Sequence, residues 1–218
     1  MKTEKEDEIN KKRFRVAIFG SARIEAKDPS WCLIYDLAKR IAEEGMDIVT
    51  GGGPGLMDAA SIGHYAGDIN REAHSIGLQI KLPKEQKDSS HIDILKDFSS
   101  FSSRLDNFME LANAVIVAPG GIGTLLELFY TWQLMQVKML SHIPIILLGD
   151  MWPDLVLWIK KWPLKNKFLE QKDVNLLHLV DNYEDALDII KKEYLINSKK
   201  KAKFSYDIST NHVSEEEH

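Results

Sequence analysis

Six short apolar runs, separated by longer segments, constrain the fold of this sequence more than any other feature. The runs span 15–20, 47–50, 75–82, 114–118, 144–148 and 176–180. Most are apolar almost throughout, which is typical of strands buried on both faces of a parallel sheet. Segments with helical spacing of apolar residues lie between them, over 31–45, from 54, over 104–113, from about 120 to 139 and from 184. This alternation predicts an α/β fold: a Rossmann-like, doubly wound parallel sheet with helices on both faces, in a single domain.

Composition narrows the class of protein. The chain has 218 residues, and we expect charged, flexible tails over 1–13 and 197–218 around a domain over 14–196. With 28 basic and 33 acidic side chains the formal charge is −5, which disfavours a nucleic-acid binder that relies on positive potential. No apolar leader and no run of roughly 20 apolar residues is visible, so we expect a cytoplasmic protein without a membrane span. Cys32 is the single cysteine and the histidines lack metal-ligand spacing, so neither an internal disulfide nor a metal site is predicted.

Three glycine-containing turns follow predicted strands, at the edge of the sheet where such folds bind ligands. They are Gly20-Ser21-Ala22-Arg23, Gly51-Gly52-Gly53-Pro54-Gly55-Leu56-Met57 and Pro119-Gly120-Gly121-Ile122-Gly123-Thr124. Glycines expose backbone amides and a helix N-terminus attracts anions, so the third turn is a candidate phosphate cradle. For the first turn a purely structural role explains the residues equally well. None of the turns has the spacing of a dinucleotide fingerprint or of a P-loop.

Glu127 lies one helical turn inside the segment that follows the third turn. Its carboxylate is placed to face a ligand held at the helix N-terminus. The simpler interpretation is that the carboxylate only complements the helix dipole, as any acid in the first turn would.

Residues 119–127 read PGGIGTLLE, which fits the PGGxGTxxE motif of the LOG ("Lonely Guy") family. GGGPGLMDAA at 51–60 resembles the GGGxxGLM segment of that family, and Gly20-Ser21 and IGLQIKLPKEQ at 76–86 are similar too, so the resemblance spans roughly 14–190. LOG proteins are nucleoside 5′-monophosphate phosphoribohydrolases, often labelled lysine decarboxylases. The resemblance implies hydrolysis of the N-glycosidic bond of AMP or a related purine nucleotide, cytokinin nucleotides among them, to free base and ribose 5-phosphate, with no cofactor.

The resemblance also implies which residues act. The catalytic pair of the family corresponds to Arg104 and Glu127. The implied substrate-binding residues are Gly20, Ser21, Gly52, Gly53, Met57, Glu85, Pro119, Gly120, Gly121, Ile122, Gly123, Thr124 and Gln133. A carboxylate stabilises the positive charge that develops on ribose and orients water. A guanidinium offsets negative charge on the departing base or holds phosphate, and the residues do not decide between these two roles for Arg104.

Three positions depart from the family pattern. Leu105 stands where the family has lysine, Tyr130 replaces a glutamate and Gln133 replaces a threonine. Such changes can alter base preference or weaken activity. The alternative function is a non-catalytic carrier of a nucleotide or of molybdenum cofactor on the same fold, which needs no carboxylate at position 127. A decarboxylase is disfavoured because no lysine lies in a recognisable setting for pyridoxal phosphate.

Family members are homodimers or larger assemblies, so we expect a homo-oligomer. Candidates for the dimer face follow the motif on a long apolar helix: Trp132, Leu134, Met135 and Met139. A core-facing helix explains each of them at least as well. Three further tryptophans are expected to pack a helix over the sheet: Trp152, Trp158 and Trp162.

Overall fold

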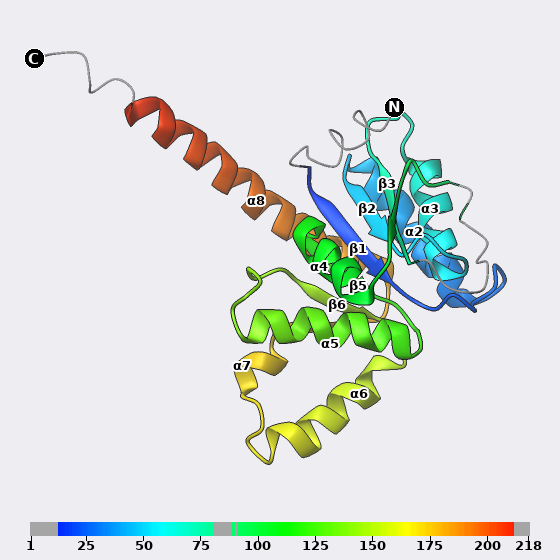
Figure 1. Cartoon of the computed structure of the whole chain (residues 1–218), viewed down its shortest axis with the longest axis vertical. Helices are drawn as coiled ribbons and strands as arrows, with labels where there is room; N and C mark the ends of the chain where they lie inside the picture. Colours follow the sequence, from blue (N-terminus) through cyan, green and yellow to red (C-terminus); the bar gives the residue numbers. More distant parts are fainter. Residues whose placement is uncertain (1–12, 81–88, 90, 212–218) are drawn as a thin grey trace, which may run out of the picture.

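The computed structural model describes residues 13–80, 89 and 91–211, and within them seven parallel strands form one sheet in the order β4-β3-β2-β1-β5-β6-β7 (Figure 1). The strands are β1 (Arg15–Phe19), β2 (Asp47–Thr50), β3 (Ser75–Ile80), β4 (Ile94–Phe98), β5 (Ala114–Val117), β6 (Ile145–Leu148) and β7 (Leu177–Val180). The chain proceeds outward from β1 to β4 and then returns to the other side of β1 with β5. The predicted α/β fold is confirmed, and its topological switch point lies between β1 and β5.

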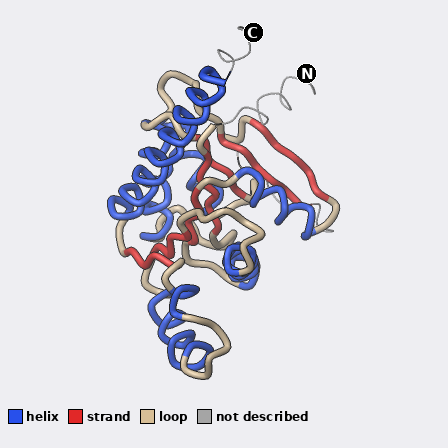
Figure 2. The backbone as a smooth tube through the Cα atoms, turned by 90° about the vertical axis from the view of Figure 1, so that its left-hand side faces the viewer, coloured by secondary structure: helices blue, strands red, loops and turns tan. Residues whose placement is uncertain are grey.

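Helices cover both faces of the sheet, and in Figure 2 the strands lie in the middle with helices on either side. The helices are α2 (Pro29–Glu43), α3 (Leu56–Gly67), α4 (Phe101–Leu111), α5 (Ile122–Gln136), α6 (Trp152–Ile159), the π-helical η1 (Lys160–Leu164), α7 (Gln171–Val174) and α8 (Tyr183–Asn211). Val16 and Ile18 of β1 pack with α2, α3 and α8, whereas Ala17 and Phe19 pack with α4, α5 and α6. This alternation follows from the two-residue period of a strand and explains why the strand sequences are apolar throughout.

The edge strand β4 was not predicted. It pairs only with β3, and Ile94 is the one of its five residues that is buried. Its sequence ILKDF therefore lacks the apolar run by which the inner strands were found, because an edge strand with open faces does not need one.

Local sequence determines where helix α2 begins and ends. The carboxylate of Asp28 accepts a hydrogen bond of 2.8 Å from the amide of Ser30, and Pro29 opens α2. At the other end, Gly45 has φ +70° and the amide of Met46 donates to the carbonyl of Ile41 at 3.2 Å. Together with the bond from the Gly45 amide to Ala42, this is a Schellman motif, and the predicted stop at Gly45 is confirmed.

The C-terminal helix is longer than the sequence analysis expected. The domain was predicted to end at 196, but α8 continues to Asn211 and extends away from the body (Figure 1). The described chain is therefore helical beyond 196, and the flexible tail expected over 197–218 stays a prediction. The lysines and the alanine just beyond 196 favour helix, and their charge alone does not end one. Residues 1–12 and 212–218 of the expected tails lie outside the described residues.

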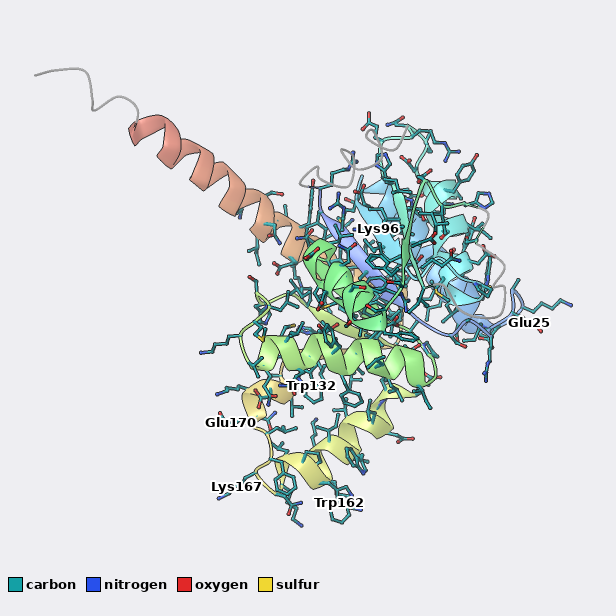
Figure 3. The ribbon with its side chains drawn as sticks, viewed as in Figure 1. Glu25, Lys96, Trp132, Trp162, Lys167 and Glu170 are labelled. Atoms are coloured by element: carbon teal, nitrogen blue, oxygen red, sulfur yellow. The ribbon has the colours of Figure 1, made fainter. Side chains whose placement is uncertain are left out.

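The tryptophans divide into core and surface. Trp152 is fully buried and packs α6 on the body together with Val156 and Ile159. Trp158 and Trp162 are 53% and 51% exposed, so the prediction that they pack over the sheet is wrong. The i, i+4, i+7 spacing of the buried residues of α6 places Trp158 on the opposite face. Figure 3 shows Trp162 at the far end of this helical segment, pointing away from the body.

The predicted dimer-face residues are divided in the same way. Trp132 and Met135 are buried in the core, and the indole Nε1 of Trp132 donates a 2.8 Å hydrogen bond to the carbonyl of Asp173. Met139 is 78% exposed, and Leu134 is partly buried. Core packing is therefore the correct interpretation for Trp132 and Met135.

The described residues offer neither a membrane-spanning helix nor a metal-binding cluster. No helix among them combines the length and the apolar character needed to cross a membrane. Within the same ranges, no group of three or more histidine, cysteine, aspartate or glutamate residues is arranged to hold a metal ion.

Candidate functional site

A cavity of about 570 Å³ lies at the carboxyl end of β1, at the topological switch point of the sheet. Its lining combines the end of β1, the turns after β1, β2 and β5, the last residue of β3, and the starts of α4 and α5. Doubly wound sheets bind ligands at this place because the strand order diverges there and leaves a crevice between neighbouring turns.

Most of the predicted site residues meet in this cavity. Its lining includes Gly20, Ser21, Met57, Arg104, Gly121, Ile122, Gly123, Thr124 and Glu127. Four predicted glycine-turn residues lie beside the cavity without lining it: Gly52, Gly53, Pro119 and Gly120. Glu85 lies outside the described residues.

Gln133 is not brought to the cavity. It lies six residues after Glu127 on α5, which places it about 240° around the helix axis. Its side chain is exposed on a different face of the helix. Gln133 therefore does not line this cavity, and its implied contact with substrate stays a prediction.

The cavity also contains residues that sequence reasoning did not assign to the site. Arg23 and Gly51 belong to two of the turns that stood out, so their position in those turns was the available signal. Ile80 and Phe101 line the cavity as well, but nothing in their residue type distinguishes them from ordinary core residues.

Arg104 and Glu127 form an ion pair inside the cavity. Nη2 of Arg104 donates to Oε1 of Glu127 at 3.0 Å, and Nε of Arg104 donates to the carbonyl of Leu78 at 2.8 Å. The two side chains are only 12% and 10% exposed. The hydrogen bond to Leu78 of β3 holds the guanidinium of Arg104 in one orientation. The carboxylate of Glu127 on α5 therefore pairs with a positive charge whose position is fixed.

Burial changes the acidity of Glu127. Removal from water raises its pKa from 4.5 to about 7, although the neighbouring Arg104 charge and hydrogen bond act in the opposite direction. Burial dominates because a carboxylate loses its hydration while a single guanidinium replaces only part of it. Near neutral pH the group is therefore able both to hold and to release a proton.

Gly51 makes room for Arg104. A Cβ at position 51 would lie 2.7 Å from Nη2 of Arg104 and 2.8 Å from Sδ of Met57. Both are closer than such atoms approach in proteins, so any side chain at 51 would displace the guanidinium. The glycine cluster after β2 thus serves the ion pair directly.

Hydrogen bonds join the three glycine-containing turns to one another. The amide of Ser21 donates to the carbonyl of Pro119 at 3.0 Å, and the amide of Leu56 donates to the carbonyl of Ser21 at 2.9 Å. Gly55 has φ +72°, and a Cβ there would overlap the carbonyl of Ser21. The first turn is therefore held between the other two, which only a glycine at 55 permits.

The start of α5 presents backbone amides to the cavity. Gly121, Ile122 and Gly123 are exposed there, and among the described residues no side chain caps this end of the 15-residue helix. Thr124 is buried against the turn. Uncapped amides and the positive end of the helix dipole make this end of the cavity suited to an anion such as a phosphate group.

The departures from the family pattern lie away from the cavity lining. Leu105 is buried in the core and does not line the cavity. The absence of the family's lysine at this position therefore does not remove a charge from the cavity lining. The hydroxyl of Tyr130 donates to a carboxylate oxygen of Asp106 and links α5 to α4 beside the Arg104–Glu127 pair.

Comparison with known proteins gives one family match. The model of the family described as "possible lysine decarboxylase" matches residues 57–190. The pyrimidine/purine nucleotide 5′-monophosphate nucleosidase of Escherichia coli K12 is 28% identical over 126 residues, covering 53% of this chain and 28% of the relative. The same enzyme of E. coli O157:H7 matches equally. The chain thus spans less than a third of the length of the curated relatives it matches.

Solved structures share the fold. The molybdenum cofactor binding protein of Rippkaea orientalis is 22% identical with a TM-score of 0.65, covering 84% of this chain and 98% of that one. The molybdenum cofactor carrier protein of Chlamydomonas reinhardtii is 22% identical with a TM-score of 0.63, covering 84% and 99%. At these identities the likeness concerns the fold alone.

Proposed function

The chain belongs to the LOG family, whose family model is described as "possible lysine decarboxylase", and from that premise we propose that it hydrolyses nucleoside 5′-monophosphates. The N-glycosidic bond of AMP or a related purine nucleotide, cytokinin nucleotides included, is cleaved to free base and ribose 5-phosphate. The observation that carries the proposal is the buried Arg104–Glu127 pair, one helical turn from the uncapped amides of α5.

The phosphate site supplies the positioning. A 5′-phosphate bound at the amides of Gly121, Ile122 and Gly123 would place the ribose along the first turn of α5. Because α5 rises about 1.5 Å per residue, Glu127 then lies roughly the length of a ribose from the phosphate. Binding energy at the phosphate thereby holds C1′ beside the carboxylate, which converts a collision into an intramolecular encounter.

Glu127 then performs the chemistry of glycoside hydrolysis. As the bond between C1′ and the base nitrogen breaks, positive charge develops on the ribose, and the carboxylate stabilises it. The water oxygen bonds to C1′ while a proton of that water passes to Glu127. The base leaves with the electron pair of the broken bond and takes up a proton. A pKa of about 7 suits a group that must accept and return a proton at neutral pH.

Arg104 supports this step in two ways. Its bond to Leu78 and its bond to Glu127 fix the direction of the carboxylate. Among the described residues, two of the five N–H donors of the guanidinium take part in these bonds, and the proposal assigns others to offset negative charge on the departing base.

The test is turnover of the purified full-length chain with a panel of nucleoside monophosphates, measured as released base and ribose 5-phosphate by chromatography. We expect release from AMP, with Glu127→Gln lowering kcat by about 100- to 10,000-fold while AMP still binds. Arg104→Ala should lower kcat as well. Glu110→Gln, which removes an exposed acid of α4 outside the cavity, serves as the matched control and should leave kcat unchanged.

The second candidate is a carrier of a phosphate-bearing ligand. Two proteins that share this fold are named as a molybdenum cofactor binding protein and a molybdenum cofactor carrier protein. A carrier would use the same glycine turns but would not need a buried carboxylate with a raised pKa. Tight binding of AMP without release of base, and no difference between wild type and Glu127→Gln, would favour the carrier over the hydrolase.

A further inference from the structure

We propose that Arg23 binds the phosphate group of the ligand and is the residue by which the cavity selects a nucleotide over its nucleoside. The inference deepens the proposed function, since the nucleotide is taken from there. It assigns a role to a side chain outside the site residues predicted from the sequence.

The backbone of Arg23 is fixed. Its amide donates to Oγ of Ser21 at 3.1 Å, within the turn after β1. That turn is bonded on one side to Pro119 and on the other to Leu56, as described above. The base of the Arg23 side chain is thus set by three neighbouring turns, which leaves only side-chain rotations to be decided by a ligand.

The guanidinium of Arg23, in contrast, has no hydrogen-bond or ion-pair partner among the described residues. It is exposed and lines the cavity. The other arginine of the lining, Arg104, is bonded to Glu127 and to the carbonyl of Leu78. An arginine without a partner among the described residues, on a hydrogen-bonded turn that lines a cavity, is suited to bind an anion.

The position of Arg23 favours phosphate over base or ribose. Its turn is hydrogen-bonded through Ser21 to Pro119, the residue that opens the turn leading into α5. Arg23 lines the same cavity as Gly121 and Gly123, whose amides form the proposed phosphate site, and this hydrogen bond joins their two turns. Arg104 enters from α4 and is bonded to Glu127, further along α5.

The charges of the cavity lead to the same assignment. A phosphate monoester carries between one and two negative charges at neutral pH, whereas the start of a helix offers only about half a positive charge. Arg104 is compensated by Glu127 whenever that carboxyl is ionised. Arg23 is then the full positive charge of the described lining that a dianionic phosphate can engage, and a guanidinium does so with two parallel hydrogen bonds.

The experiment measures equilibrium binding to the full-length chain by calorimetry, in a Glu127→Gln background so that no turnover interferes. AMP, adenosine and inorganic phosphate are the probes. We expect Arg23→Ala to weaken AMP by about 10- to 100-fold and to change adenosine by less than about twofold. Inorganic phosphate should compete with AMP, and do so less effectively in Arg23→Ala. Arg23→Lys should retain part of the affinity, since it keeps the charge but not the paired donors.

Lys27→Ala is the matched control, because Lys27 is an exposed cation of the same loop that does not line the cavity. It should bind AMP as the parent does. Equal weakening of AMP and adenosine in Arg23→Ala, or no weakening of AMP, overturns the inference. Absence of any base release by the wild type, with AMP binding that still depends on Arg23, overturns the hydrolase and leaves the role of Arg23 standing.

Discussion

At the scale of single residues, Glu127 is where folding and function conflict. A carboxyl buried beside one guanidinium keeps less stabilisation of its charge than it had in water, so its pKa rises to about 7. A protein selected only for stability would gain from a neutral residue at this position. The fold therefore tolerates a local penalty at the residue to which we assign the chemistry.

This penalty predicts a pH dependence of stability. In the folded state the pKa of Glu127 lies above its unfolded value of 4.5, so the folded chain binds the proton more tightly. The resulting contribution to the free energy of unfolding is fully present below about pH 4.5 and is lost as the pH rises through 7. At pH 8 Glu127→Gln should therefore be more stable than wild type by roughly 1–3 kcal/mol, measured by urea denaturation.

The difference between the two proteins should shrink steadily as the pH is lowered from 8 to 5. Glu25→Gln is the control, because Glu25 projects from the loop before α2 into solvent (Figure 3) and its neutralisation should not produce such a trend. A stability difference that stays constant between pH 5 and pH 8 would show that Glu127 ionises normally in the folded protein.

The site was predictable wherever residue type carries the signal. Glycines 121 and 123 stand out because they expose backbone amides at the start of a predicted helix, where an anion is attracted. The pairing of Arg104 with Glu127 came from the family resemblance, since no local pattern relates two residues 23 positions apart. Gln133, which the resemblance also implied, does not line the cavity because six residues of helix separate it from Glu127 by about 240°.

At the scale of elements, the two long helices that flank the sheet end in the same way with different residues. α5 ends in a Schellman motif like that of α2: the amide of Met139 donates to the carbonyl of Leu134 at 2.9 Å, and that of Lys138 to Met135 at 3.1 Å. The left-handed position is held by Lys138, with φ +61°, whereas α2 has Gly45 there. A lysine in this conformation is strained where a glycine is not.

Lys138→Gly should therefore stabilise the protein by about 0.5–1 kcal/mol, seen as a higher denaturation midpoint with an unchanged slope. The gain is moderated by the greater freedom of glycine in the unfolded chain. Lys165→Gly is the matched control: Lys165 is also an exposed lysine at a helix end, but its φ is −60°. There glycine brings no relief, so the substitution should destabilise, and a gain at both positions would contradict the strain argument.

The elements missing from the sequence analysis share one physical cause. The inner strands are predictable because burial on both faces demands an apolar run, whereas Ile94 alone is buried in β4. The extension of α8 to Asn211 was missed because a lysine-rich segment reads as a solvated tail, although lysine favours helix once a helix is under way. Apolar patterns in the sequence therefore predict the buried strands and helices, but not an edge strand such as β4 or the C-terminal end of α8.

At the scale of the whole molecule, α5 exposes an apolar stripe beside the cavity. Ile122, Leu126 and Phe129 follow one another at i, i+4 and i+7 and are 86%, 44% and 40% exposed. Because Ile122 also lines the cavity, whatever covers this stripe borders the site. The homo-oligomer expected from the family is the occupant we propose for it.

We accordingly expect the chain to be a dimer in solution and Phe129→Glu to shift it toward monomer by at least about tenfold in dissociation constant, measured by sedimentation velocity. Burial of a charge without a partner is the reason. Ile69→Glu serves as the control, since Ile69 is also an exposed apolar residue, at 84%, but lies in the loop after α3. A wild-type monomer at micromolar concentration, or a Phe129→Glu dimer of undiminished affinity, would show that the stripe is not the interface.

The mutual bonding of the three turns has a consequence for how a ligand arrives. Ser21 hydrogen-bonds the turn after β1 to Pro119 and to Leu56. These loops therefore lose their conformational entropy when the chain folds. A ligand then binds to a preformed cavity. Its association rate is limited by diffusion and desolvation, and not by ordering of the loops. Loosening this one serine carbonyl from Leu56 would shift that entropic cost from folding to binding.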